Sequence, residues 1–514
     1  MKRSKEPSKI LTHEKWIAFS AIEQQQDNLN ILGEDIWRAH DRSGHEKNSH
    51  DILVAFLKKR DFKVKPHYKG FPHAFRASFG ETASGGAEHP NVGFLCQYDI
   101  DPERGHCHGH NLATAVAVTA ALGLQPVIKF AQEPIGMVTI IGCQGNATGT
   151  GKIEMMEAGC FKGIDFLLTA YPAHFTNIKP RFIGCRTHKI TFRGRTRKEG
   201  DRPWEVANPV NATVLAYQNI AAIRQQFNCE WVAKGVILNG GTRADVMPET
   251  ASMEYLLKAP KPLEMKVLGD MVHQCFNGAA TATGCRFDVE STGHEFLCNM
   301  VPEALVDLYN KNASLMGFTF HNRQEDLQSH DDIANVSTSV PTLKVFYYAG
   351  TGSKLGTDEF SRYAGSKESQ FMTILQGKAL AMMAVDLITS EERMRDVFEQ
   401  HQEELSKYYG PLSQTPQTTH HAQEEKQEKD ETRREPRGSV AAGVDQDAGQ
   451  VATAEEPTSD KQAKRDSQGT ARESNPLNAP KEGEKEAASA NGGANGSGGI
   501  EENQTGSDKS GQNN

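Results

Sequence analysis

The spacing of apolar residues switches repeatedly between a helical and a strand period along this chain. Residues 48–60 carry apolar residues at helical spacing, with Asn48 or Ser49 as a candidate N-cap. Residues 92–96 form a short apolar run, which is typical of a buried strand. A helix rich in small apolar residues is predicted to begin near Asn111, and such residues suit close packing against a sheet.

The same alternation continues with a strand, a helix and a strand, predicted at residues 137–143, 151–161 and 165–171. Strands that alternate with helices at this spacing favour an α/β domain with a mainly parallel sheet. The pattern returns near the end of this region, where residues 366–388 are predicted to form a long helix.

The middle of the chain shows a different order of elements. A strand is followed by a helix, two strands, a second helix and a closing strand, at residues 188–194, 208–227, 231–241, 251–259, 262–284 and 285–291. The order β-α-β-β-α-β is the ferredoxin-like pattern. Its insertion into an α/β chain predicts a discontinuous larger domain that carries a small lid.

Four regions follow from these patterns. They are a flexible N-terminus (1–12), a discontinuous α/β domain (13–187 and 298–395), an inserted lid domain (188–297) and a largely disordered polar tail (396–514). The tail has no aromatic residue after Tyr409, so it cannot bury enough apolar surface to offset the entropy of ordering.

Charge is concentrated in that tail. The chain of 514 residues has a net charge of −9, and residues 401–514 carry 21 acidic and 13 basic side chains. The remainder is therefore almost neutral, which gives no electrostatic reason to expect binding of nucleic acid or of an anionic membrane. The tail is instead a candidate for binding an unknown protein partner.

Neither a membrane nor an oxidising compartment is expected from the sequence. No run approaches the roughly 18 apolar residues that span a bilayer, and the N-terminus lacks the apolar core of a signal peptide. Nine cysteines are scattered singly without a C-x-x-C pair. We therefore predict reduced thiols and a cytosolic or nuclear location.

Several ordered stretches carry a family resemblance. They are FRASFG at 75–80, FLCQYDIDPERGHCHGHNLATA from 94, GKIEMMEAGCFKGIDF from 151 and YAGSKESQF from 363. With the predicted element order, they resemble the aminoacylase and carboxypeptidase family of di-zinc metallopeptidases, and within it the cytosolic dipeptidases. In that family two zinc ions activate a water molecule, a Glu removes its proton, and a His from the lid stabilises the oxyanion.

Some family ligands are retained in this sequence. The motif H-A-C-G-H-N reads HCHGHN here, so His110 is kept, His108 occupies the position of the cysteine ligand, and Cys107 lies one position earlier. The early E-Y-D motif reads QYD and keeps Asp99. The resemblance therefore implies His108, His110 and Asp99 as the remaining candidate metal ligands.

Other family positions have lost the residue type that the chemistry requires. Asn146 stands in place of the general base, and Ala147 in place of a carboxylate ligand. Tyr171 and Gly356 replace two histidine ligands, and Lys198 replaces the histidine of the lid. An amide cannot accept the proton from water, and neither a methyl group nor a glycine can bind zinc.

These losses predict a catalytically inactive homologue of a cytosolic zinc dipeptidase that acts by binding or assembly and needs no cofactor. The resemblance implies a homodimer through the lid, and a mixed dimer with an active paralogue is a further hypothesis. One alternative is a dipeptidase or amidohydrolase with a rebuilt single-metal site that holds zinc on His108, His110 and Asp99. Another is a scaffold that acts through the acidic tail.

Overall fold

The structure is a computed structural model of the whole chain. It describes residues 11–81, 89–145, 149–195, 206–318 and 329–409. The chain divides into two compact units, residues 1–419 and 420–514. The second unit and the predicted tail from residue 410 onward lie outside the described residues.

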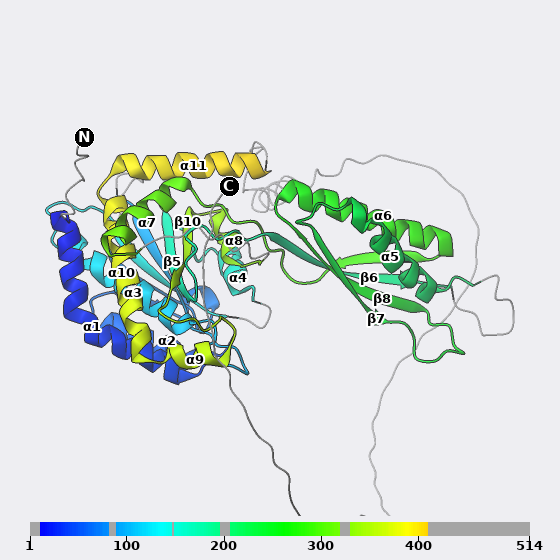
Figure 1. The fold of residues 1–514 in the computed structure, drawn as a ribbon, viewed down its shortest axis with the longest axis horizontal. Coiled ribbons are helices and arrows are strands. Elements are labelled where there is room, and N and C mark those ends of the chain that lie inside the picture. The colour runs from blue at the N-terminus through cyan, green and yellow to red at the C-terminus, as the bar shows by residue number, and fades with distance from the viewer. Residues whose placement is uncertain (1–10, 82–88, 146–148, 196–205, 319–328, 410–514) are drawn as a thin grey trace, which may run out of the picture. The chain divides into compact units, whose positions relative to one another are not determined.

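The larger sheet has six strands in the order β1-β2-β4-β3-β5-β10 (Figure 1). Their bounds are β1 Lys63–Pro66, β2 Phe75–Gly80, β3 Asn91–Gln97, β4 Met137–Cys143, β5 Phe166–Ala173 and β10 Thr342–Tyr348. Strands β4, β3, β5 and β10 are parallel neighbours, whereas β1 and β2 are antiparallel. The expected α/β class is confirmed, with an antiparallel pair added at one edge.

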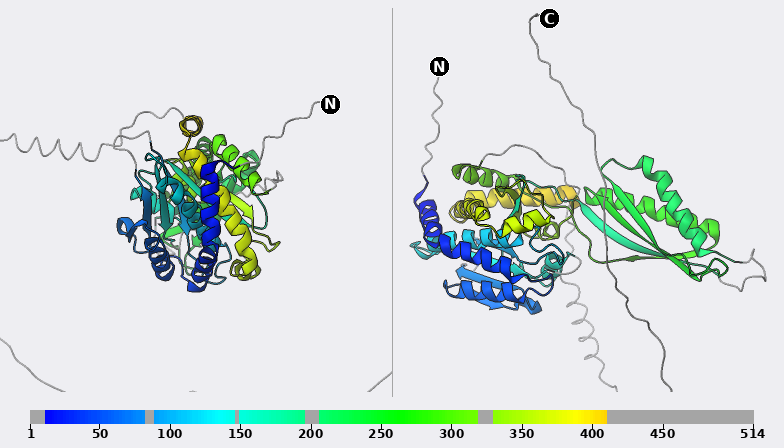
Figure 2. Two further views of the ribbon diagram at one scale, coloured as in Figure 1. Left: turned by 90° about the vertical axis from the view of Figure 1, so that its left-hand side faces the viewer. Right: turned by 60° about the horizontal axis from the view of Figure 1, so that its bottom comes forward.

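Helices cover this sheet on both faces. Their bounds are α1 His13–Ala39, α2 Lys47–Lys58, α3 His110–Lys129, α4 Gly151–Glu157, α7 Glu303–Leu315, α8 Ile333–Ser337, α9 Asp358–Ala364, α10 Lys367–Ile388 and α11 Glu391–Tyr409. Helices α1, α3 and α10 contact one another, and Figure 2 shows α1 in blue beside α10 in yellow.

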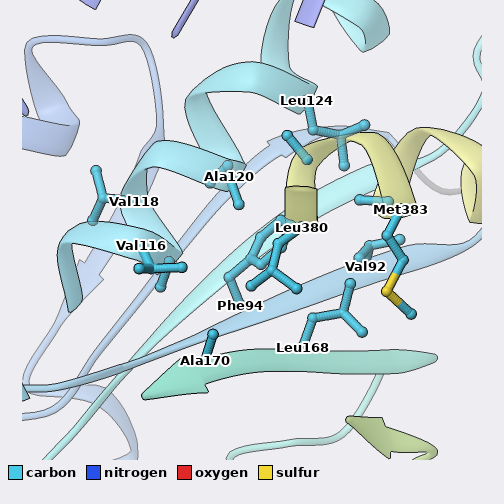
Figure 3. Close-up of a cluster of buried hydrophobic side chains, with 14 of the residues drawn as sticks. Val92, Phe94, Val116, Val118, Ala120, Leu124, Leu168, Ala170, Leu380 and Met383 are labelled. Carbon is cyan, nitrogen blue, oxygen red and sulfur yellow. The ribbon is translucent and has the colours of Figure 1, made fainter. Parts of the chain in front are cut away.

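Successive residues of β3 explain why both faces must be covered. Phe94 and Leu95 point to opposite faces of the sheet, and both are fully buried. Phe94 packs with Leu168 of β5 and Leu380 of α10 in the main core (Figure 3). Leu95 belongs to a smaller cluster with residues of α4 and α8. A strand that is buried on both faces reads as the continuous apolar run seen in the sequence.

Helices α3 and α10 bear on the expectation that no segment crosses a membrane. Each is long and apolar enough to cross a membrane by length and composition alone, with a mean hydropathy of 1.5 over its most apolar window. In each case 83% of that window is buried inside the protein. Their apolar surface is therefore used in packing against the sheet and against each other.

A second, four-stranded sheet follows the order β7-β8-β6-β9 and is antiparallel throughout. Its elements are β6 Gly184–Arg193, α5 Pro209–Ile223, β7 Val232–Asn239, β8 Thr250–Ala259, α6 Pro262–Thr283 and β9 Arg286–Ser291. The chain order is β-α-β-β-α-β. Helices α5 and α6 pack on the sheet around their own buried cluster, which includes Phe192, Tyr255 and Phe276.

The described chain continues past residue 395, where the sequence analysis places the start of the polar tail. Helix α11 crosses this boundary and buries Met394, Val397, His401 and Leu405. These residues recur at intervals of three and four, which places them on one face of the helix. The predicted start of the polar tail is therefore corrected from residue 396 to a position after residue 409. One buried face can order a helix whose average composition is polar.

Candidate functional site

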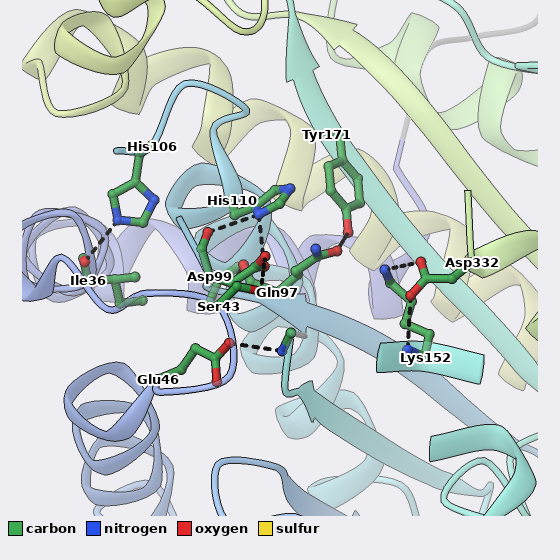
Figure 4. A network of polar contacts seen from close by, with 12 residues as sticks. Ile36, Ser43, Glu46, Gln97, Asp99, His106, His110, Lys152, Tyr171 and Asp332 are labelled. Carbon is green, nitrogen blue, oxygen red and sulfur yellow. Dashed lines mark hydrogen bonds and ion pairs between the residues drawn. The ribbon is translucent and has the colours of Figure 1, made fainter. Parts of the chain in front are cut away.

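The predicted site residues come from elements that end at one edge of the larger sheet. Asp99 lies just beyond β3, Tyr171 lies in the neighbouring strand β5, and His110 begins α3. Parallel strands present their carboxyl ends together, which is where α/β proteins usually place their functional residues. Figure 4 shows Gln97, Asp99, His110 and Tyr171 gathered at this edge.

Asp99 and His110 contact each other directly. The Nδ1 atom of His110 lies 3.0 Å from Asp99 Oδ1 and 3.0 Å from the main-chain oxygen of Asp99. Ser43 Oγ donates a hydrogen bond of 3.4 Å to Asp99 Oδ2. Burial alone would raise the pKa of Asp99, but His110 outweighs this effect and holds that pKa well below its usual range. The contact orients the imidazole with Nε2 directed away from Asp99.

Tyr171 forms a hydrogen bond where the resemblance implies a zinc ligand. Its hydroxyl donates to Gln97 Oε1 over 2.6 Å, and its ring forms a T-shaped pair with the His110 ring, with the centroids 5.7 Å apart. Burial raises the pKa of Tyr171 well above that of a free phenol, so the hydroxyl is neutral at physiological pH. The ammonium of Lys344 lies 3.8 Å from the centre of the Tyr171 ring.

Two buried ion pairs lie beside Tyr171. Lys152 Nζ is 2.5 Å from Asp332 Oδ1, and the main-chain N–H of Lys152 donates to Asp332 Oδ2 over 2.9 Å. Lys344 pairs with Asp331. Burial disfavours the charged form of Lys152, but Asp332 outweighs this effect and raises the pKa of the lysine. These four charges compensate one another inside the protein.

The loop between β3 and α3 brings together a set of ligand-type side chains that the resemblance does not imply. The ligand atoms of Asp101, Cys107 and His108 all lie within 4.8 Å of one another, the one such group of three or more found among the described residues. This set shares only His108 with the predicted set, and the rings of His108 and His110 are 5.9 Å apart. The sequence feature that could have revealed this group is the occurrence of an Asp, a Cys and a His within eight residues of one loop.

Gly356 adjoins this loop. Its N–H donates to the main-chain oxygen of Cys107 over 2.9 Å, and its φ is +80°. A Cβ atom at this position would lie 3.8 Å from His108 Cε1. His108 therefore lies beside the position from which the family's histidine ligand would project.

The remaining predicted positions cannot be placed. Asn146, Ala147 and Lys198 lie outside the described residues. Among the described positions, Tyr171 bonds to Gln97 and Gly356 has no side chain, so they do not fit the pair of zinc ions that the resemblance implies.

Glu46 is a buried carboxylate that the sequence analysis missed. Its Oε1 atom accepts hydrogen bonds from the N–H groups of Gly44 and Gly145, at 2.6 and 3.0 Å. Its Oε2 atom is buried and has no partner among the described residues. Burial raises the pKa of Glu46 to about 7, with a smaller contribution from the charge of Asp99. Only the fold shows this, because a Glu before a helix is common on protein surfaces.

Comparison with known proteins gives clear relatives. The chain is 33% identical to the Xaa-Arg dipeptidase of Mus musculus over 381 residues, which cover 72% of this chain and 88% of the mouse protein. It is 30% identical to the Xaa-Arg dipeptidase of Homo sapiens, over 74% of this chain and 89% of the human protein. No family model matches the chain.

Solved structures agree on the fold. A dinuclear metal-binding peptidase of the M20 family from Bacillus subtilis superimposes with a TM-score of 0.54 and 16% identity, over 69% of this chain and 98% of the bacterial one. A putative aminohydrolase from methicillin-resistant Staphylococcus aureus gives a TM-score of 0.60 at 13% identity, over 73% of this chain and all of that chain. With the two dipeptidases, these findings show that the chain belongs to the aminoacylase and dipeptidase family of metallopeptidases.

Proposed function

We propose that this protein keeps the fold of the zinc dipeptidases but does not hydrolyse peptides, and that it acts by binding or assembly. The observation that carries this proposal is the hydrogen bond of 2.6 Å between Tyr171 and Gln97. Both residues stand where the family is expected to carry zinc-binding or acidic side chains. Here each side chain is the hydrogen-bond partner of the other. Neither a neutral phenol nor an amide is a normal zinc ligand.

The charge at the site supports the same proposal. Lys344 places an ammonium over the ring of Tyr171 and is buried with its partner Asp331. The ammonium of Lys344 already engages the carboxylate of Asp331, so this carboxylate is not available to a zinc ion. In addition, Asn146 cannot serve as the base that removes a proton from water.

The purified protein is expected to release no amino acid from a panel of dipeptides, including ones with a C-terminal arginine, in the presence of zinc. Loss of the general base alone lowers rates by about 10²- to 10⁴-fold, and loss of the metals adds to this. Mouse Xaa-Arg dipeptidase, assayed in parallel, is the positive control. Zinc-dependent hydrolysis that disappears on chelation would refute the proposal.

A second candidate function is a hydrolase with one metal ion on His108, His110 and Asp99. The contact between His110 Nδ1 and Asp99 favours His110 as a ligand through Nε2, because histidines that bind metals usually give their other ring nitrogen to a carboxylate or a carbonyl group. In this arrangement Asp99 orients the imidazole. This candidate predicts hydrolysis that His110→Ala abolishes. The same assay therefore separates the two candidates.

We further propose that the protein is cytosolic, with reduced thiols, and assembles as a homodimer through the lid. All nine cysteines are unpaired, and eight of them are buried. Edge strand β7 exposes Val236 and Leu238, each with 51% of its surface accessible. An exposed apolar edge strand is a ready surface for pairing with a second chain, whether a copy of this one or an active paralogue.

Sedimentation of the intact protein is expected to show a dimer, and Leu238→Lys is expected to shift it to a monomer. Phe130→Lys is a matched control, since Phe130 is 71% exposed on the larger domain and should leave the dimer intact. A parent protein that sediments as a monomer would refute the proposed assembly.

A further inference from the structure

We propose that Asp101, Cys107 and His108 form a mononuclear site for a borderline-soft divalent cation such as zinc. All three ligand atoms lie within 4.8 Å of one another, on one loop between β3 and α3. This set differs from the two-zinc site of the family. It also stands apart from the proposed loss of hydrolysis, because a metal held here would occupy a different set of ligands.

The chemistry of the three side chains selects the cation. A thiolate, an imidazole and a carboxylate suit zinc or cobalt, whereas calcium and magnesium require oxygen ligands throughout. Bonds of about 2.0–2.3 Å to zinc place tetrahedral ligands roughly 3.5 Å apart, so closure needs shifts of about 1 Å. One thiolate and one carboxylate also neutralise a dication, which removes the need for a buried counter-ion.

The backbone already holds the Asp101 ligand in place. Asp101 and Gly105 exchange two main-chain hydrogen bonds, with distances of 3.0 and 2.9 Å. Oδ1 of Asp101 accepts from the N–H groups of Glu103 and Arg104, at 3.0 and 2.9 Å. These bonds fix the orientation of the carboxylate, and no hydrogen bond among the described residues uses Oδ2.

The main chain of Cys107 is held by its own loop and by a second segment of the chain. Cys107 donates its N–H to Gly105 and accepts from the N–H of Gly356, each over 2.9 Å. Since Gly356 has no side chain, the space beside His108 Cε1 is open. The absence of a side chain at Gly356 therefore leaves room for the imidazole of His108 to adjust its position.

The position of the Cys107 sulfur explains why a metal ion would bind here and not at the site that the family uses. The resemblance implies a thiolate at position 108, but here the thiol is at 107 and is buried beside Asp101 rather than Asp99. His110 meanwhile gives Nδ1 to Asp99. The shift of the cysteine by one residue therefore places the thiol within reach of Asp101.

Cobalt titration of the full chain tests this site, with cobalt content measured after gel filtration. We expect about one equivalent of cobalt per chain and an absorption band from sulfur-to-cobalt charge transfer, because a thiolate is one of the ligands. Cys107→Ser is expected to abolish the band and to weaken binding by more than about tenfold. Cys229→Ser, which alters an exposed thiol elsewhere, is the matched control and should change neither quantity.

Two further variants keep the test decisive. Asp101→Asn retains an oxygen for the two N–H groups of the loop but loses the charge, so it should weaken cobalt binding without unfolding the protein. His110→Ala should leave the sulfur band unchanged. No bound cobalt, a band that survives Cys107→Ser, or binding that depends on His110 but not on Cys107 would overturn the proposal. None of these outcomes depends on whether the protein hydrolyses dipeptides.

Discussion

Replacing Lys152 with methionine is expected to lower the free energy of unfolding by about 3–5 kcal/mol. Lys152 and Asp332 expose only 6% and 7% of their side chains, and their charged atoms are 2.5 Å apart. Removing the ammonium would leave a carboxylate buried without its counter-charge, which costs far more than the pair itself contributes. Urea unfolding at pH 7 measures the change.

Three controls separate this effect from simple loss of packing. Lys47→Met removes one side of an exposed pair, with side chains 75% and 53% accessible, and should change stability by less than about 0.5 kcal/mol. The double variant Lys152→Met with Asp332→Asn should recover most of the loss, because the amide is neutral and still accepts from the N–H of residue 152.

The third control is pH. Burial already raises the pKa of Asp332, and loss of the lysine should raise it further. A protonated carboxylic acid needs no counter-charge, so the defect of Lys152→Met should be smaller at pH 5 than at pH 8. A stability loss below about 1 kcal/mol at pH 8 would contradict the proposed importance of this pair.

The stability of the protein is also expected to fall by up to about 3 kcal/mol between pH 4.5 and pH 7, through Glu46 alone. The pKa of Glu46 is raised from 4.5 to about 7 in the folded protein. Across this window the unfolded chain loses its proton while the folded chain keeps it. The contribution of Glu46 to the free energy of unfolding is therefore complete below pH 4.5 and is lost as the pH rises through 7.

Urea unfolding over this pH range tests the effect with a matched pair of variants. Glu46→Gln keeps an oxygen for the N–H groups of Gly44 and Gly145 but cannot ionise. It should lack this component of the pH dependence and be more stable than the parent at pH 8. Glu392→Gln, on the exposed start of α11, should follow the parent. An unchanged pH profile in Glu46→Gln would show that this carboxyl has an ordinary pKa.

Much of the fold follows from the sequence because its signals are local. The strand predicted at residues 137–143 has the same bounds as β4, and the order β-α-β-β-α-β is present as predicted. Each of these two predictions depends on the spacing of apolar residues within a short segment of the chain. The absence of family residue types at Ala147, Tyr171 and Gly356 is likewise plain from the sequence, because ligand chemistry depends on the identity of each side chain.

The partners of the site residues were decided by the tertiary structure. Tyr171 bonds to Gln97, 74 residues away, and Lys152 pairs with Asp332, 180 residues away. Helix α11 is ordered by one buried face, although its composition is polar. Such contacts depend on how parallel strands and their loops meet in space, and no local pattern records this. The sequence by itself determined which chemistry was lost, while the fold decided which side chains now stand together, since hydrogen bonds, ion pairs and metal ligands act over a few ångströms of space and not along the chain.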